Sequence, residues 1–315
     1  MKLNNNKKTV IALFGPTAVG KTQLAMEVSD ALGCPLISVD SAMVYRGMDI
    51  GTSKPDLTTL ARYPHDLVSI RDFTDFYSVQ DFVTDATVKI NSYHAEGKTP
   101  LLVGGTMLYF YALQHGLSEL PATSVEVRAQ LQRRLEGEGL TALYIQLQQC
   151  DPLRAAAIHP NDTQRILRAL EVFTATGKPM SAFLEGARSC SEWEWVNIAL
   201  VPFERSVLHH NIALRWQKMV QEGFIAEVEA LQAMPGFDYN LPAMRSVGYR
   251  QVLAYLAGRC TAQERDVAAC TATRQLAKRQ LTWMNQWDSC YSVKVELTDL
   301  PIKYVQSLLQ SKIAE

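Results

Sequence analysis

The sequence predicts an α/β fold in which a parallel sheet is covered by helices and an all-helical segment is inserted. Two observations support this prediction. Patterns typical of strands and helices alternate from residue 10 to residue 105, which indicates a parallel sheet with helices between its strands. Beyond Pro121 the pattern changes, and residues 125–183 show helical periodicity without a strand signal.

The first half of the chain can be followed element by element. Apolar residues 10–14 form the first expected strand, and apolar side chains at helical spacing predict a helix over residues 21–32. Gly33 ends this helix, because glycine readily adopts the left-handed conformation found at helix C-termini. The remaining elements of this half are strands over residues 36–40, 67–70 and 99–105 and a helix over residues 78–95.

The second half predicts a helical insertion within the α/β core. After the helical stretch, a strand is expected over residues 195–201, one long helix over residues 205–231, and helices close the chain. We therefore expect three segments, with the first part of the core in residues 1–120, the helical insertion in residues 121–190, and the completion of the core with C-terminal helices in residues 191–315.

Composition argues against several classes of protein. The formal net charge is −1, although residues 245–279 contain seven basic side chains and only two acidic ones. A near-neutral chain is not expected to coat nucleic acid without selectivity, so any such contact depends on a local patch. No apolar run approaches the roughly 20 residues of a membrane helix, and the cysteines form no C-x-x-C pair. We expect a reduced, cytoplasmic protein with no membrane or DNA partner.

The octapeptide GPTAVGKT (residues 15–22) has the G-x-x-x-x-G-K-T spacing of a phosphate-binding loop. Gly15 and Gly20 permit the turn, backbone N–H groups point toward the phosphate, and Lys21 supplies a cation. Because a predicted strand precedes the loop and a predicted helix follows it, the core is expected to be P-loop NTPase-like.

Other chain segments are expected to meet this loop, because ligands bind at the carboxyl ends of parallel strands. The second strand delivers Asp40, and a later strand delivers Gly104, Gly105 and Thr106. By position alone, Asp40 could cap a helix, could bind magnesium indirectly through a water or a direct ligand, or could be a catalytic group. The later strand lacks the terminal aspartate that holds magnesium in most nucleotide hydrolases, which favours a diphosphate other than that of ATP.

Seven stretches, in order and over nearly the whole chain, resemble the bacterial tRNA dimethylallyltransferases, which are the tRNA isopentenyltransferases of the IPP transferase family. They are GPTAVGKT, DSAMVYRGMDIGTSKP (residues 40–55), YSVQDF (77–82), LVGGTMLY (102–109), HPNDTQRILRALEVF (159–173), RSVGYR (245–250) and TRQLAKRQLTW (273–283). Seven collinear matches are very specific. The resemblance implies a P-loop core with a helical insertion, as the patterns suggest independently.

The resemblance also implies a reaction. The dimethylallyl group passes from dimethylallyl diphosphate to the exocyclic amine of the adenine 3′-adjacent to the anticodon, in tRNAs that read codons starting with U. By resemblance, Asp40 accepts a hydrogen of that amine, and the Thr106 hydroxyl orients the base. Arg215 lies near the diphosphate, and Mg²⁺ is held partly through the Thr22 hydroxyl. The implied partners are dimethylallyl diphosphate and the anticodon stem-loop of tRNA.

Two sets of binding residues follow from the resemblance. For the diphosphate they are Gly15, Pro16, Thr17, Ala18, Val19, Gly20, Lys21, Thr22 and Arg215. For tRNA they are Asp40, Ser41, Ala42, Met43, Thr106, Arg128, Gln164, Arg165, Ile166, Leu167, Arg168, Arg245, Ser246, Val247, Gly248, Tyr249, Arg250, Lys278, Arg279, Gln280, Leu281, Thr282, Trp283, Met284 and Asn285. We expect rings for stacking from Tyr249 and Trp283 and an amide edge from Gln280, although a basic helix is commonly solvated surface and a tryptophan commonly a core anchor.

Other functions stay open at this point. Transfer of the same group to free adenine nucleotides, as by an adenylate dimethylallyltransferase, would need the same crevice but has no use for a basic C-terminal helix. A small-molecule P-loop kinase would use the insertion as a lid over its acceptor. A non-catalytic RNA-binding module would carry a vestigial loop, and the intact Gly20, Lys21 and Asp40 argue against it.

Overall fold

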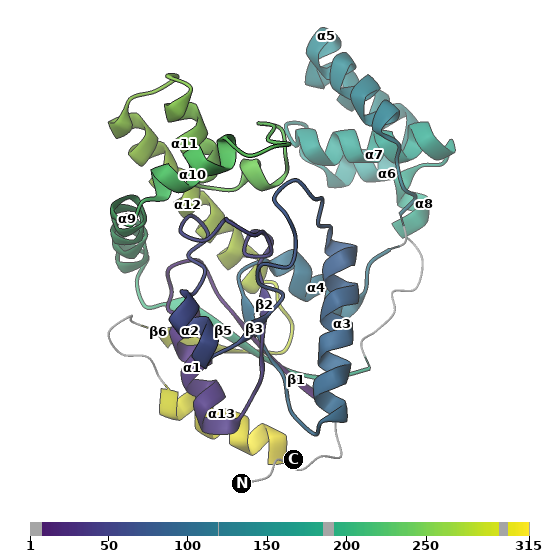
Figure 1. Ribbon diagram of the computed structural model, residues 1–315. Coiled ribbons are helices and arrows are strands. Elements are labelled where there is room, and N and C mark those ends of the chain that lie inside the picture. The colour runs from purple at the N-terminus through teal and green to yellow at the C-terminus, as the bar shows by residue number, and fades with distance from the viewer. Residues whose placement is uncertain (1–7, 119, 185–191, 296–301, 315) are drawn as a thin grey trace. The chain divides into compact units, whose positions relative to one another are not determined.

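A computed structural model describes residues 8–118, 120–184, 192–295 and 302–314 of the chain (Figure 1). The chain divides into two compact units. The larger unit comprises residues 1–114 and 191–315, and the smaller unit comprises residues 115–190. Among the helices described, none is both long and apolar enough to cross a membrane.

The larger unit is built on a parallel sheet, whose strand order in the described part of the chain is β3-β2-β4-β1-β5-β6. The strands are β1 (Thr9–Phe14), β2 (Leu36–Val39), β3 (His65–Asp66), β4 (Leu101–Gly104), β5 (Glu194–Pro202) and β6 (Cys290–Val295). Phe14 of β1 and Val39 of β2 both pair with Gly104 of β4. The carboxyl ends of these three strands are therefore level, and the segments that follow them emerge side by side.

Both faces of the sheet are covered, which is why its strands are nearly continuous apolar runs. Alternate side chains of β1 point to opposite faces. Phe14 joins the core formed with α3 (Val79–Ala95) and α4 (Met107–His115), whereas Leu13 joins the core formed with α1 (Lys21–Leu32) and α13 (Ile302–Ala314). Figure 1 shows α1 and α13 side by side.

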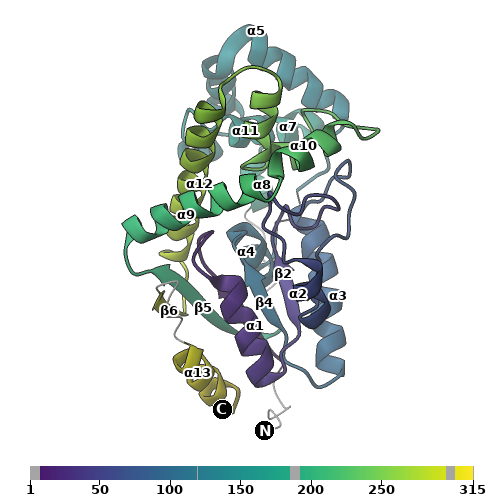
Figure 2. The same cartoon turned by 60° about the vertical axis from the view of Figure 1, so that its left-hand side comes forward.

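A group of helices lies beyond the carboxyl ends of the central strands in both views (Figures 1 and 2). It consists of α9 (Arg205–Gln221), α10 (Phe224–Gln232), the short 3₁₀ helix η1 (Ala243–Arg245), α11 (Tyr249–Leu256) and α12 (Ala262–Met284). A short helix, α2 (Leu57–Arg62), precedes β3. Of these elements, α9, η1, α11 and α12 contribute side chains to the place above the sheet where parallel strands bind ligands.

The described residues of the smaller unit form helices joined by loops and contain no strand. It contains α5 (Val125–Cys150), α6 (Pro152–Ala157), α7 (Thr163–Thr176) and α8 (Met180–Leu184). Its own core includes Leu131, Leu143, Leu147, Ile166 and Leu170, each at most 2% exposed. This agrees with the all-helical pattern predicted over residues 125–183.

Local signals predicted several elements correctly. The helix expected over residues 21–32 is α1, and Gly33 ends it with a φ of 67°. The helix expected over residues 78–95 is α3, where the Ser78 side chain and Asp81 form a capping box. The end of α1 and the start of α3 therefore lie at residues whose backbone or side-chain chemistry favours a helix terminus.

Three expectations about elements were wrong. The strand expected over residues 67–70 lies at His65–Asp66, because Leu67 and Ser69 have positive φ angles that an extended strand does not allow. The helix expected over residues 205–231 is two helices, because Gly223, with a φ of 99°, separates α9 from α10. The strand β6 was not expected at all, since helices were predicted to close the chain.

Candidate active site

A cavity of about 510 Å³ opens at the carboxyl ends of β1, β2 and β4, entirely within the larger unit. Its lining comes from the phosphate-binding loop, from the segments after β2 and β4, and from α9 and α12. Many of the residues predicted from the sequence line it. These are Thr17, Lys21, Thr22, Asp40, Ser41, Ala42, Met43, Thr106, Arg215, Arg245, Ser246, Val247, Gly248, Tyr249, Arg279, Gln280 and Trp283.

The phosphate-binding loop has the turn that its glycines predict. A Cβ atom on Gly15 would lie 2.9 Å from the backbone oxygen of Leu200 in β5, so the loop passes too close to the sheet for a side chain. Gly20 has a φ of 94° and stands directly before α1. The helix N-terminus therefore faces the cavity with its unpaired N–H groups, which is an arrangement that binds anions.

Lys21 and Arg215 bring two half-buried cationic side chains to the cavity. Burial and, to a smaller extent, the nearby charge of Arg215 lower the pKa of Lys21 to about 7, with Asp40 acting in the opposite direction. Burial also lowers the pKa of Arg215, again with Asp40 acting in the opposite direction. The Lys21 Nζ donates to the Pro16 carbonyl oxygen at 2.8 Å. An anion at this place would favour the charged forms of both side chains.

Asp40 and Thr106 are held together by the turn after β2. Oδ1 of Asp40 accepts hydrogen bonds from the N–H groups of Ala42 and Met43, at 2.8 and 3.1 Å. The Thr106 hydroxyl oxygen accepts one from the N–H of Ser41 at 3.2 Å. Within the described residues no hydrogen bond reaches Oδ2 of Asp40. The aspartate is therefore a cap of its own turn through one oxygen, while the other stays available to a ligand.

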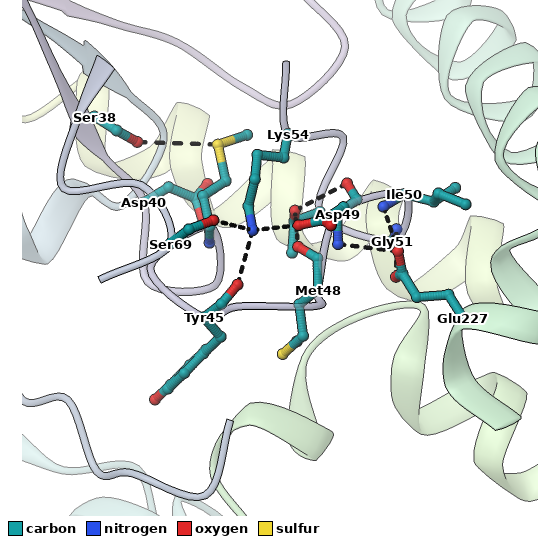
Figure 3. A network of polar contacts seen from close by, with 12 residues as sticks. Ser38, Asp40, Tyr45, Met48, Asp49, Ile50, Gly51, Lys54, Ser69 and Glu227 are labelled. Carbon is teal, nitrogen blue, oxygen red and sulfur yellow. Dashed lines mark hydrogen bonds and ion pairs between the residues drawn. The ribbon is translucent and has the colours of Figure 1, made fainter. Parts of the chain in front are cut away.

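Two residues that sequence reasoning did not single out, Glu227 and Lys54, hold the loop of residues 48–54 in place (Figure 3). Glu227 accepts hydrogen bonds from three backbone N–H groups of this loop. Lys54 donates to the Tyr45 carbonyl oxygen and the Ser69 hydroxyl, at 2.8 and 2.9 Å. The sequence offers no signal for the Glu227 contacts, which join residues up to 178 positions apart.

The structure corrects two roles predicted for cavity residues. Tyr249 is fully buried, its hydroxyl donates to Glu227, and its ring packs edge-on against Phe224, so the ring is not available to stack on a base. Gln280 is 7% exposed and uses both ends of its amide inside the protein. Its Oε1 accepts from the Thr17 N–H at 3.0 Å, and its Nε2 donates to the Gly105 carbonyl oxygen at 2.8 Å. Gln280 therefore joins the phosphate-binding loop to the segment after β4 instead of offering an amide edge to RNA.

The basic residues of the larger unit that were predicted to bind tRNA are exposed. Arg245 and Arg279 stand at the cavity, and Arg250 and Lys278 lie on the outer surface of α11 and α12. Trp283 is half-buried at the cavity with its ring edge-on to Tyr111, at a centroid distance of 5.7 Å. Other predicted contacts on α12 and after it differ in exposure, since Met284 is buried, Leu281 is half-buried, and Thr282 and Asn285 are exposed.

The smaller unit presents some of its predicted tRNA contacts and buries others. Arg128 and Arg165 are more than half exposed, and Gln164 is exposed. Ile166 is fully buried in the helical core and Leu167 packs against it, so these two side chains are structural. Arg168 donates to the Thr123 hydroxyl, the Pro121 carbonyl oxygen and Glu171, which engages it inside the unit.

The described residues contain no group of three or more His, Cys, Asp or Glu side chains that could hold a metal ion. Thr22 lines the cavity directly after Lys21. Magnesium commonly keeps few protein ligands and takes the rest of its oxygen ligands from substrate phosphates and water. The residues present therefore fit a magnesium ion held by the Thr22 hydroxyl together with a bound diphosphate.

Comparison with known proteins places this geometry in a family. A family model described as IPP transferase matches residues 43–287, and a model described as isopentenyl transferase matches residues 8–74. The chain belongs to the IPP transferase family. Membership confirms the resemblance carried by the seven sequence stretches, and it makes the chain a prenyl-transferring enzyme with a P-loop-like core.

Relatives of this IPP transferase match it over its whole length. A tRNA dimethylallyltransferase 2 of Hahella chejuensis is 45% identical over 328 residues, which cover 99% of each chain. The crystal structure of the full-length tRNA isopentenylpyrophosphate transferase of Bacillus halodurans has a TM-score of 0.70 at 34% identity and covers 98% of this chain and 97% of its own. A eukaryotic dimethylallyltransferase acting on tRNA has a TM-score of 0.78 at 25% identity, with 96% of this chain and 78% of that chain covered.

Proposed function

We propose that this IPP transferase is a tRNA dimethylallyltransferase, which transfers the dimethylallyl group of dimethylallyl diphosphate to the exocyclic amine of the adenine 3′-adjacent to the anticodon. The observation that carries the proposal is one cavity that holds a carboxylate, Asp40, beside two half-buried cationic side chains, Lys21 and Arg215. The end of the cavity at Lys21 and Arg215 suits a diphosphate leaving group, and the end at Asp40 suits a weakly nucleophilic amine. The location in the cell that we propose for the enzyme is the cytoplasm.

The diphosphate end works by charge stabilisation. When the bond between the prenyl carbon and the diphosphate oxygen breaks, negative charge grows on the leaving group. The loop of residues 15–22 offers backbone N–H groups at the start of α1, and Lys21 and Arg215 add their charges. Magnesium, when bound through the Thr22 hydroxyl and the diphosphate oxygens, would neutralise further charge there.

The amine end works by proton acceptance. The exocyclic nitrogen of adenine is a poor nucleophile because its lone pair is delocalised into the ring. Oδ2 of Asp40 accepts one of its hydrogens as the carbon–nitrogen bond forms, so the nitrogen gains no lasting positive charge. Oδ1 meanwhile keeps the turn in place through Ala42 and Met43. The Thr106 hydroxyl, 3.2 Å from the Ser41 nitrogen, orients the same base.

The reaction is a direct displacement. The carbon–oxygen bond to the diphosphate breaks, the carbon–nitrogen bond to adenine forms, and one amine proton passes to the Asp40 carboxylate. A covalent intermediate on the protein would need an activated nucleophile. The sequence motifs contain no such group, so the two substrates react with each other inside the cavity.

The proposed tRNA contacts of the larger unit are exposed cations and one half-buried ring. Arg245, Arg250, Lys278 and Arg279 supply charge for phosphates in the larger unit, and Trp283 supplies a ring at the cavity. An adenine stacked in an anticodon loop cannot reach an enclosed site, so the base must be turned out of its stack. Arg128, Gln164 and Arg165 make further contacts from the helical insertion of residues 121–190.

The substrate can be tested directly. The protein is incubated with magnesium and dimethylallyl diphosphate, once with an unmodified tRNA that reads codons starting with U and once with AMP. Mass analysis of the nucleosides is expected to show one dimethylallyl adduct on the tRNA adenine and none on AMP. Modified AMP beside untouched tRNA would keep the chemistry of the cavity and overturn the proposed acceptor, and phosphoryl transfer from ATP to a small acceptor would overturn both.

A further inference from the structure

The carboxylate of Glu227 on α10 is surrounded by donors from one short loop. Oε2 accepts from the N–H groups of Asp49 and Ile50 at 3.0 and 2.6 Å, and Oε1 accepts from the N–H of Gly51 at 3.1 Å. The Tyr249 hydroxyl donates to Oε1 at 2.6 Å. Successive N–H groups that converge on one anion form a nest, and bonds to a charged acceptor are stronger than neutral ones. Figure 3 shows Glu227 facing the three N–H groups.

The loop of residues 48–54 is held together by its own backbone hydrogen bonds. The N–H of Ser53 donates to the Ile50 carbonyl oxygen and the N–H of Lys54 donates to the Asp49 carbonyl oxygen, both at 2.9 Å. A Cβ atom on Gly51 would lie 2.1 Å from the Phe224 ring, so the loop is pressed against α10 with no space for a larger residue. Any change at Glu227 therefore shifts the loop as a unit.

The same loop also contacts Arg215, the arginine proposed to bind the diphosphate. Arg215 Nη2 donates to the Thr52 carbonyl oxygen at 3.3 Å, and Thr52 and Ser53 line the cavity. The position of the guanidinium group thus depends on where the loop places that carbonyl oxygen. The charge of Asp40 also acts on Arg215. A displaced guanidinium group would therefore lie at a different distance from the Asp40 carboxylate as well as from the diphosphate.

A second anchor keeps the loop attached without Glu227. The Lys54 side chain is 4% exposed and donates to Asp49, to the Tyr45 carbonyl oxygen and to the Ser69 hydroxyl. Figure 3 shows Lys54 at the centre of this cluster. Because this anchor is independent of Glu227, a conservative change at Glu227 is expected to shift the loop and not to unfold it.

We propose that Glu227 is a positioning residue for the diphosphate site, which acts through the loop of residues 48–54 on Arg215. The inference rests on the proposed function for the identity of the diphosphate substrate. Glu227 itself touches no reacting atom. It sets the place of the guanidinium group relative to Lys21 and Asp40 before the substrate binds.

The test is Glu227→Gln with Glu229→Gln as its matched control. Glu229 lies on the same helix and is exposed. In Glu227→Gln an amide group replaces one acceptor oxygen and meets N–H donors, so the loop must shift. We expect the Kd for inorganic pyrophosphate with magnesium and the KM for dimethylallyl diphosphate to rise roughly tenfold, since misplacement of about 1 Å in a site can cost up to a hundredfold. The Kd for tRNA should stay within about twofold in both variants.

A double-mutant cycle separates positioning from general damage. If Glu227 acts through Arg215, then Glu227→Gln should weaken pyrophosphate binding in the wild type and have almost no further effect in an Arg215→Ala background, because coupled residues are not additive. Equal effects in both backgrounds would overturn the proposal. So would unchanged pyrophosphate binding accompanied only by a lower melting temperature, which would make Glu227 purely structural.

Two further readouts keep the outcome decisive. Tyr249→Phe removes one of the four donors and leaves the loop N–H groups in place, so it should show the same pattern at smaller size, and it replaces Glu227→Gln if that variant does not fold. An unchanged pyrophosphate Kd in a folded Tyr249→Phe would then contradict the proposal. Pyrophosphate binding is read without tRNA, so a wild type that binds pyrophosphate but modifies no tRNA would reject the proposed function and leave this inference standing.

Discussion

The hydroxyl oxygen of Thr106 accepts a hydrogen bond from the backbone N–H of Ser41, with 3.2 Å between the two atoms. This bond ties the segment after β4 to the turn that carries Asp40. The register of the sheet makes it possible, because Val39 at the end of β2 pairs with Gly104 at the end of β4. Two groups assigned to the adenine therefore have a fixed relation before any substrate binds.

Thr106→Val should lower kcat/KM for tRNA modification by roughly tenfold to a hundredfold, because the isosteric side chain keeps the packing and loses the acceptor for Ser41. Thr106→Ser should recover most of the loss, since it keeps the hydroxyl. Steady-state kinetics with both variants checks this. Equal activity of Thr106→Val and the wild type would remove the hydroxyl from the site.

Diphosphate binding should weaken as the pH rises above 7. Burial and Arg215 lower the pKa of Lys21 to about 7, so above that pH the free protein holds this side chain neutral. An anion binds the protonated form, and binding must then take up a proton, which raises the Kd toward roughly tenfold per pH unit. Titration with dimethylallyl diphosphate without tRNA, between pH 6 and 9, measures it. In Lys21→Arg the cation does not titrate, and an equally steep profile in that variant would contradict the assignment.

Arg279→Ala should weaken tRNA binding. It should also reduce the slope of log Kd against the logarithm of the salt concentration by about one, since each phosphate contact releases counterions. Lys98→Ala is the matched control, because Lys98 is an exposed cation that pairs with Glu96 after α3. The control should leave the slope unchanged. A salt slope that does not move in Arg279→Ala would exclude this arginine from the tRNA interface.

Gly104→Ala should prevent correct folding of the larger unit. A Cβ atom at Gly104 would lie 2.0 Å from the Val39 backbone oxygen, a distance that no rearrangement of a side chain can relieve. Gly137→Ala on α5 meets open space, and an alanine in a helix is more stable than a glycine by about 1 kcal/mol. Thermal unfolding followed by circular dichroism compares the two. A stable Gly104→Ala would show that β2 and β4 can move apart.

Local chemistry explains why much of the site could be predicted from the sequence. The conformation of the phosphate-binding loop is determined by residues that are adjacent in the sequence. The same holds for α1, whose start at Lys21 and end at Leu32 follow from the adjacent glycines, Gly20 and Gly33. Asp40 and Thr106 could be placed because they follow strands whose carboxyl ends meet in a parallel sheet. The resemblance to a known family supplied the reaction and Arg215.

Long-range contacts explain what could not be predicted. The Gln280 amide bonds to Thr17 across 263 positions, and no local pattern separates such a buried glutamine from one that faces RNA. Tyr249 has the same ambiguity, since its burial depends on Phe224 and Glu227 in another helix. The strand β3 was misplaced because a positive φ at Leu67 leaves no signature in an apolar residue.

The central claim is that Asp40 accepts the amine proton while Lys21 and Arg215 receive the leaving diphosphate. Asp40→Asn tests it most directly, because the amide oxygen still caps the turn through Ala42 and Met43 and only the basicity is lost. In single-turnover reactions with saturating tRNA and dimethylallyl diphosphate, we expect transfer to slow by at least roughly a hundredfold, the range of general base catalysis. The Kd for tRNA should be unchanged. A transfer rate equal to that of the wild type would contradict the account.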